Sequence, residues 1–145
     1  MNRKERTWVL VEDQTALAAE LAAQARELFN VEVREEPRLM LIMNKIRESA
    51  QNSLFYGGET LVTRARVVIQ DKSGLGLICG EHYQKALNLA IIDAAYEQLP
   101  AAEKNAWDNQ ILEHRKQLLA ELGYQQYLIN QTKVSFEVME VEEQS

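Results

Sequence analysis

The sequence predicts an α+β fold, in which a small antiparallel sheet of about four strands packs with three to four helices, one of them central and apolar. Three observations support this class. Side chains alternate with period two from Glu59 to Gln70, and apolar residues recur at helical spacing in other stretches. Five of the six glycines lie between Gly57 and Gly80, between long regular segments.

Length and composition indicate one globular domain. The 145 residues, 46% hydrophobic and 26% charged, predict a single domain over residues 1–145 with a frayed acidic end at residues 140–145. A net charge of -6 disfavours nucleic acid as a partner. The longest apolar run, Leu39–Met43, is far shorter than a membrane span of ~18 residues. With Cys79 as the single cysteine, we expect a cytoplasmic chain that holds no metal or cofactor.

The N-terminal third predicts one helix followed by an extended segment. Asp13 or Thr15 can cap a helix that runs to about Phe29. Its apolar stripe is Leu17, Leu21, Ala25 and Leu28. The preceding Thr7–Val11 segment suits either a strand or a short helix, and periodicity cannot decide between them. Pro37 then stops any helix and opens a β-leaning segment, Arg38–Arg47.

The middle of the chain predicts a hairpin. One face of the strand Glu59–Gln70 is expected to carry Leu61, Thr63, Ala65, Val67 and Ile69, and the other Val62, Arg64, Arg66 and Val68. A turn at Asp71–Gly74 leads to a second strand, Leu75–Cys79, and Gly80 ends that strand.

Two helices and a last strand complete the prediction. The helix Glu81–Gln98 is apolar on almost every side, so it must be central or covered by another chain. Pro100 ends it, and a helix from Ala102 to Leu122 follows, with Gly123 as its stop. The stripe of that helix is Trp107, Ile111, Leu118 and Leu122. Val134, Phe136 and Val138 alternate with polar residues and predict a final strand.

Several residues are candidates for binding an anion. Arg64 and Arg66 would lie about 7 Å apart on one face of their strand, as an anion site or as a solvated face paired with acids. The glycines of Gly74-Leu75-Gly76, and Gly80 before a helix, suit either a phosphate cradle or ordinary capping. His82 is a proton carrier or a surface residue.

Two further polar residues need partners. Asp93 lies within the apolar helix, where an unpaired carboxylate is costly, so we expect an ion pair with Arg64 or Lys85, or a binding role across a subunit boundary. His114 lies on the apolar stripe of its helix and is interpreted as a core or interface histidine. We find no triad signature and therefore assign no catalytic residue.

A longer pattern in the chain resembles a known family. It comprises Phe55-Tyr56-Gly57-Gly58-Glu59-Thr60-Leu61-Val62-Thr63-Arg64-Ala65, then Gly80, Ala86, Ala90 and Ile92-Asp93-Ala94, with Trp8 and Leu10 before it and Val134, Phe136 and Met139 after it. This pattern is similar to the PhnG family, subunits of the bacterial carbon–phosphorus lyase system. The family motif residues here are Phe55, Tyr56, Gly58, Glu59 and Thr63.

The resemblance implies membership of a core complex with the PhnH, PhnI and PhnJ proteins, two copies of each. The complex replaces the adenine of ATP with a phosphonate, giving α-D-ribose 1-methylphosphonate 5-triphosphate. ATP and the phosphonate would be substrates of the complex, with catalysis chiefly on PhnI and PhnJ. This chain would then have no catalytic activity in isolation. Its large aromatic side chains are of the residue types that contribute most to obligate protein–protein interfaces. The candidate anchors are Tyr96, Trp107, Tyr124 and Tyr127.

Two alternatives remain open. The first is a free-standing enzyme or phosphate-ester binder that uses Arg64, Arg66, His82 and Asp93. The second is a homodimeric scaffold without a ligand. ATP binding by the chain alone would favour the first, and the lack of both partner and nucleotide would favour the second.

Overall fold

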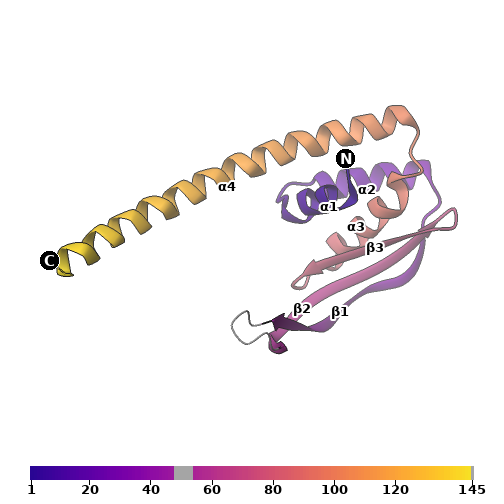
Figure 1. The fold of residues 1–145 in the computed structure, drawn as a ribbon. Coiled ribbons are helices and arrows are strands. Elements are labelled where there is room, and N and C mark those ends of the chain that lie inside the picture. The colour runs from indigo at the N-terminus through magenta and orange to yellow at the C-terminus, as the bar shows by residue number, and fades with distance from the viewer. Residues whose placement is uncertain (48–53, 145) are drawn as a thin grey trace.

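The computed structural model describes the backbone of residues 1–47 and 54–144, and the side chains of residues 1–43 and 58–128. The elements are α1 (Arg3–Glu12), α2 (Leu17–Leu28), β1 (Glu32–Arg47), β2 (Leu54–Ile69), β3 (Lys72–Cys79), α3 (Tyr83–Tyr96) and α4 (Ala101–Gln144). The predicted α+β class is therefore confirmed. The helices gather on one side of the sheet, and α4 passes over α1 and α2 before it projects away (Figure 1).

The sheet is an antiparallel meander with strand order β1-β2-β3. The predicted hairpin is present, but its turn lies earlier than expected. Gln70 and Asp71 adopt positive φ angles of 48° and 69°, and Lys72 already begins β3. Positive φ at both central residues matches the twist of the flanking strands, which favours this two-residue turn.

The prediction of a fourth strand is wrong. Within the described backbone the sheet has three strands, and Val134–Val138 belongs to the 44-residue helix α4. An alternation of five residues is too short to distinguish a strand from part of a helix. The predicted stop at Gly123 is also wrong, because that glycine lies inside α4, where it lowers helix propensity without ending the helix.

The structure resolves the ambiguity at the N-terminus. Thr7–Val11 is helical and belongs to α1, whose N-cap Asn2 accepts a hydrogen bond from the backbone N–H of Glu5 at 2.7 Å. The hydroxyl of Thr15 accepts one from the N–H of Leu17 at the start of α2. The predicted stripe of α2 is buried except for Leu28, which is 46% exposed.

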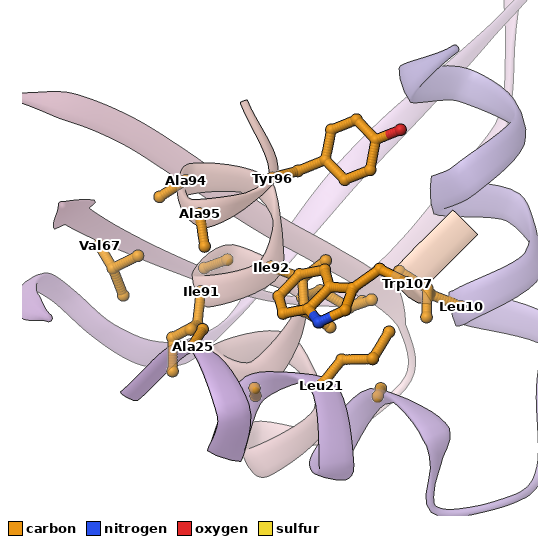
Figure 2. Packing of buried hydrophobic residues seen from close by; sticks show 14 of the residues in the cluster. Leu10, Leu21, Ala25, Val67, Ile91, Ile92, Ala94, Ala95, Tyr96 and Trp107 are labelled. Atoms are coloured by element: carbon orange, nitrogen blue, oxygen red, sulfur yellow. The ribbon is translucent and has the colours of Figure 1, made fainter. Parts of the chain in front are cut away.

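The core lies between α3, the other helices and the inner face of the sheet (Figure 2). Nine residues of α3 are buried: Ala86, Asn88, Leu89, Ala90, Ile91, Ile92, Ala94, Ala95 and Tyr96. From α4, Trp107 inserts its ring into the core and donates from Nε1 to Oε1 of Gln24 at 2.9 Å. The proximal part of α4 is thereby joined to α2.

Candidate functional site

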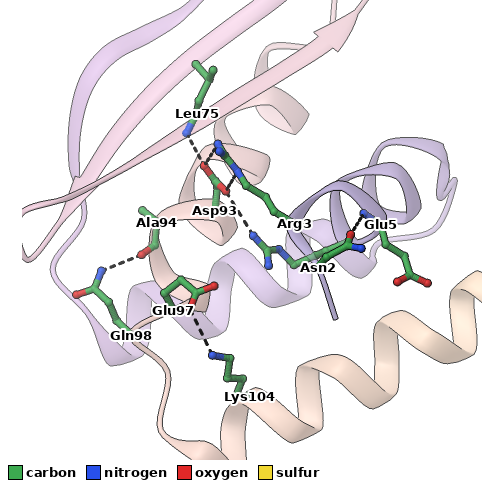
Figure 3. A network of polar contacts seen from close by, with 10 residues as sticks. Asn2, Arg3, Glu5, Leu75, Asp93, Ala94, Glu97, Gln98 and Lys104 are labelled. Carbon is green, nitrogen blue, oxygen red and sulfur yellow. Dashed lines mark hydrogen bonds and ion pairs between the residues drawn. The ribbon is translucent and has the colours of Figure 1, made fainter.

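Asp93 connects three elements through its carboxylate (Figure 3). Arg3 donates from Nε to Oδ1 at 2.9 Å and from Nη2 to Oδ2 at 2.8 Å, and Arg6 approaches Oδ1 at 3.4 Å. The backbone N–H of Leu75 donates to Oδ2 at 3.0 Å. The expected pairing of Asp93 with Arg64 or Lys85 is therefore wrong, because α1 packs closer to this face of α3 and supplies both arginines.

Arg6 is the buried member of this cluster, at 3% exposure. Its guanidinium lies 3.9 Å from the centre of the Tyr96 ring, a distance at which a cation and an aromatic face attract. The Tyr96 hydroxyl donates to Asp108 Oδ1 at 2.6 Å. Burial, and then this hydrogen bond, raise the pKa of Tyr96 to about 12. The cluster thus joins α1, α3 and α4.

The glycines of Gly74-Leu75-Gly76 serve close packing. A Cβ atom at Gly74 would lie 2.1 Å from the carbonyl oxygen of Ala90, and one at Gly76 would lie 1.9 Å from that of Ala86. Both distances are far inside van der Waals contact, so β3 can approach α3 only without these side chains. The close approach accounts for both glycines in structural terms, without a phosphate.

Thr63 fixes the loop before α3. Its hydroxyl donates to the carbonyl of Gly80 at 2.6 Å and accepts from the backbone N–H of His82 at 3.0 Å. Thr63 is fully buried, and Gly80 has a φ of +88°, which favours glycine. The structure therefore brings together the candidate residues Thr63, Gly80 and His82. His82 is exposed and is the N-cap residue of α3.

A cavity of about 520 Å³ opens beside this loop, and Cys79, His82 and Lys85 contribute to its lining. Lys85 donates from Nζ to the carbonyl oxygens of Val11 at 3.0 Å and Asp13 at 2.7 Å, at the end of α1. Lysine at this position satisfies carbonyl groups that a helix terminus leaves free.

Asp13 also joins α4 to the body. Its Oδ1 lies 2.7 Å from Nδ1 of His114, and its Oδ2 accepts from the Thr15 hydroxyl. Burial alone would raise the pKa of Asp13, but the hydrogen bonds with Thr15 and His114 and the charge of His114 hold it below its usual value. His114 thus has a carboxylate partner at the boundary between α4 and the α1–α2 connection.

Arg64 and Arg66 lie on the other face of the sheet from Thr63 and are half-buried. Leu77 and Leu75 of β3 stand opposite them, respectively. Nε of Arg64 lies 3.4 Å from a carboxylate oxygen of Glu35. Their roles, and those of the other candidate residues, stay predictions.

The family-motif residues lie along β2. Phe55 and Tyr56 are paired with Ile46 and Lys45 in the backbone register, but their side chains lie outside the described residues. Gly58 has a φ of +119°, beside a register shift in the β1–β2 pairing. Glu59 is exposed, and only Thr63 has a described side-chain role.

The aromatic anchors divide into two pairs. Tyr96 and Trp107 are 2% and 1% exposed, so the structure uses them in the core of this chain. Tyr124 and Tyr127 are 63% and 58% exposed on the projecting part of α4. Sequence reasoning missed the cluster made by Arg3 and Arg6, although two arginines three residues apart share a face of a helix.

Among the described side chains, no group of three or more His, Cys, Asp or Glu residues could hold a metal ion. No helix in the described part of the chain is long and apolar enough to cross a bilayer. A search of curated proteins found no match. The family model described as phosphonate metabolism protein PhnG matches residues 1–140, and the chain therefore belongs to the PhnG family.

Proposed function

We propose that this chain is a subunit of the carbon–phosphorus lyase core complex of phosphonate catabolism, in which it assembles with the PhnI, PhnH and PhnJ proteins and a second copy of itself. The complex would carry out the transferase step that replaces the adenine of ATP with a phosphonate to give α-D-ribose 1-methylphosphonate 5-triphosphate. The role of this chain would be assembly, in the cytoplasm, while its partners supply the catalytic groups. Membership of the PhnG family supports the pathway.

The projecting half of α4 is the observation that carries the assembly role. Past the part of α4 that packs on α1, no other element within the described residues lies beside it (Figure 1). Exposed apolar side chains there include Leu122, Tyr124 and Tyr127. Helices in proteins draw most of their stability from packing an apolar face, so this segment suits a surface completed by another chain.

The candidate residues of the alternative enzyme are engaged separately. Arg64 lies beside Glu35 on the outer face of the sheet, whereas the described contacts of Asp93 are with Arg3, Arg6 and Leu75. An anion site built from Arg64 and Asp93 would need these side chains to leave their present partners. This separation favours the assembly role.

Coexpression tests the proposal. The tagged chain is produced together with the PhnI, PhnH and PhnJ proteins, and the material that it retains is identified by mass. Tyr124→Glu places a charge on the exposed face of α4 and should weaken retention, whereas Gln125→Glu on the same exposed turn should not. Retention of none of the three proteins, or turnover of ATP with a phosphonate by the isolated chain, would contradict the proposal.

A further inference from the structure

Strand β1 is an edge strand whose two halves differ. It lies at the end of the sheet order, so within the described residues one of its edges is unpaired. The first half, Glu32–Arg38, carries charged residues, Pro37 and two register irregularities. These are the features by which proteins prevent an edge strand from pairing with another chain.

The second half lacks these features. Leu39–Met43 is an uninterrupted apolar run, and its pairing with β2 is regular from Arg38 to Asn44. Leu41 and Met43 are 60% and 54% exposed, although both belong to a strand of the sheet. The distal part of the β1–β2 hairpin reaches past α1, α2 and α3 (Figure 1). An apolar edge without these protective features is a template for an added strand.

We infer that the Leu39–Met43 edge pairs with the same segment of a second copy of this chain, antiparallel, about a two-fold axis at Leu41. The inference rests on the second copy named in the proposed function and deepens it, because it names the surface that joins the two copies. It predicts a continuous six-stranded sheet across the two copies, twice the three strands of one chain. Such an interface is isologous, because each copy contributes the same surface.

The sequence of the edge is self-complementary in this register. Leu41 faces its own copy, Met40 faces Ile42, and Leu39 faces Met43, so each apolar residue meets another. At the ends of the regular run, Arg38 faces Asn44, and no two like charges stand opposite each other.

Neighbouring registers match less well. The two-fold axis that relates the two copies is perpendicular to the sheet, and residues opposite each other then point to the same face. Any other register must therefore place the axis at a different residue of the strand. A centre at Met40 would set Arg38 against Ile42, and a centre at Ile42 would set Leu39 against Lys45. Charge and hydropathy therefore select Leu41 as the centre.

The oligomeric state of the purified full chain tests the inference. Light scattering over a range of concentrations should give a dimer. Leu41→Lys sets two positive charges opposite each other at the centre and removes the leucine–leucine contact, so it should raise the dimer dissociation constant about 100-fold. The control is Leu77→Lys, at a leucine that is 42% exposed on the other edge strand, and it should leave the dimer intact. Circular dichroism checks the fold of both variants.

A cysteine cross-link tests the register independently of that substitution. In a Cys79→Ser background, Leu41→Cys should form a disulfide-linked dimer on mild oxidation, because opposite residues lie about 5 Å apart. Met43→Cys should not cross-link to itself, since the two copies of residue 43 would be roughly 13 Å apart along the strands.

Several outcomes would overturn the inference. They are a monomeric wild-type chain, a dimer that Leu41→Lys does not weaken, and equal cross-linking at positions 41 and 43. If the chain is a monomer, and Leu41→Lys weakens its retention of PhnI, PhnH or PhnJ, the edge pairs with a strand of that partner instead. That last result would leave the proposed function standing, so the two failures are distinguishable.

Discussion

Asp93 of α3 and Arg3 of α1 form a two-bonded ion pair across 90 positions of sequence, with donor–acceptor distances of 2.9 and 2.8 Å. Arg3 is exposed, whereas Arg6 beside it is buried against the same carboxylate. The two bonds from Arg3 fix the orientation of the Asp93 carboxylate. The buried guanidinium of Arg6 depends on this carboxylate as its charge partner.

Asp93→Ala should therefore lower the free energy of unfolding by about 3 kcal/mol, because it leaves the Arg6 guanidinium buried without an anion. Urea denaturation of the variant measures this. Glu97→Ala is the control, since Glu97 pairs with Lys104 at the surface and its loss should change stability by less than about 0.5 kcal/mol. Equal losses in the two variants would contradict the proposed dependence.

Gly76→Ala should prevent β3 from docking on α3, because the added Cβ would lie 1.9 Å from the carbonyl oxygen of Ala86. We expect a loss of at least about 3 kcal/mol, or a chain that does not fold. Gly123→Ala is a matched control inside α4, where a Cβ meets nothing within 4 Å. It should stabilise the protein by about 0.5–1 kcal/mol. Thermal unfolding of both variants compares the effects, and a tolerated Gly76→Ala would refute the packing role.

These two sites show what the sequence could and could not predict. The β2–β3 hairpin was predictable because one face of β2 is buried, which leaves a period-two pattern along the strand. The packing role of Gly74 and Gly76 was not, because it depends on the carbonyl groups of a helix that follows later in the chain. The spacing of Ala86, Ala90 and Ala94 is a signal of that close approach, since residues four apart share a helix face.

Errors at the C-terminal end have a different cause. The alternation at Val134–Val138 predicts a strand, but five residues of alternation are too few to exclude a helix, and the structure continues α4 through them. Gly123 predicts a helix end, but a glycine ends a helix only where the chain turns, and α4 continues through this residue. The partner of Asp93 was missed because it depends on how α1 packs on α3, which local sequence does not encode.

Thr63→Val should loosen the loop that leads into α3. Valine keeps the shape of threonine but loses the bonds to the Gly80 carbonyl and the His82 N–H. Leaving those groups without a partner should cost about 1–3 kcal/mol. Hydrogen exchange at the amide of His82 should accelerate in Thr63→Val and stay slow in Thr63→Ser, which keeps the hydroxyl. Unchanged exchange in the valine variant would show that the hydroxyl does not hold the loop.

Asp13 predicts a pH dependence at the acidic end. Its pKa is lower in the folded protein than its ordinary value of 3.8, so the unfolded chain binds the proton more strongly. The stabilising contribution is therefore present above about pH 3.8 and is lost as the pH falls through the folded pKa. In Asp13→Asn, the slope of unfolding free energy against pH should flatten below that value. An unchanged slope would show that the contacts of Asp13 with Thr15 and His114 do not couple its protonation to folding.

The most direct measurement of the central claim is the mass of the tagged chain and its companions, recovered from cells growing on a phosphonate. Recovery with the PhnI, PhnH and PhnJ proteins, through contacts that Tyr124→Glu weakens, is the predicted result. Recovery of the chain alone, with conversion of ATP by that single species, would contradict it.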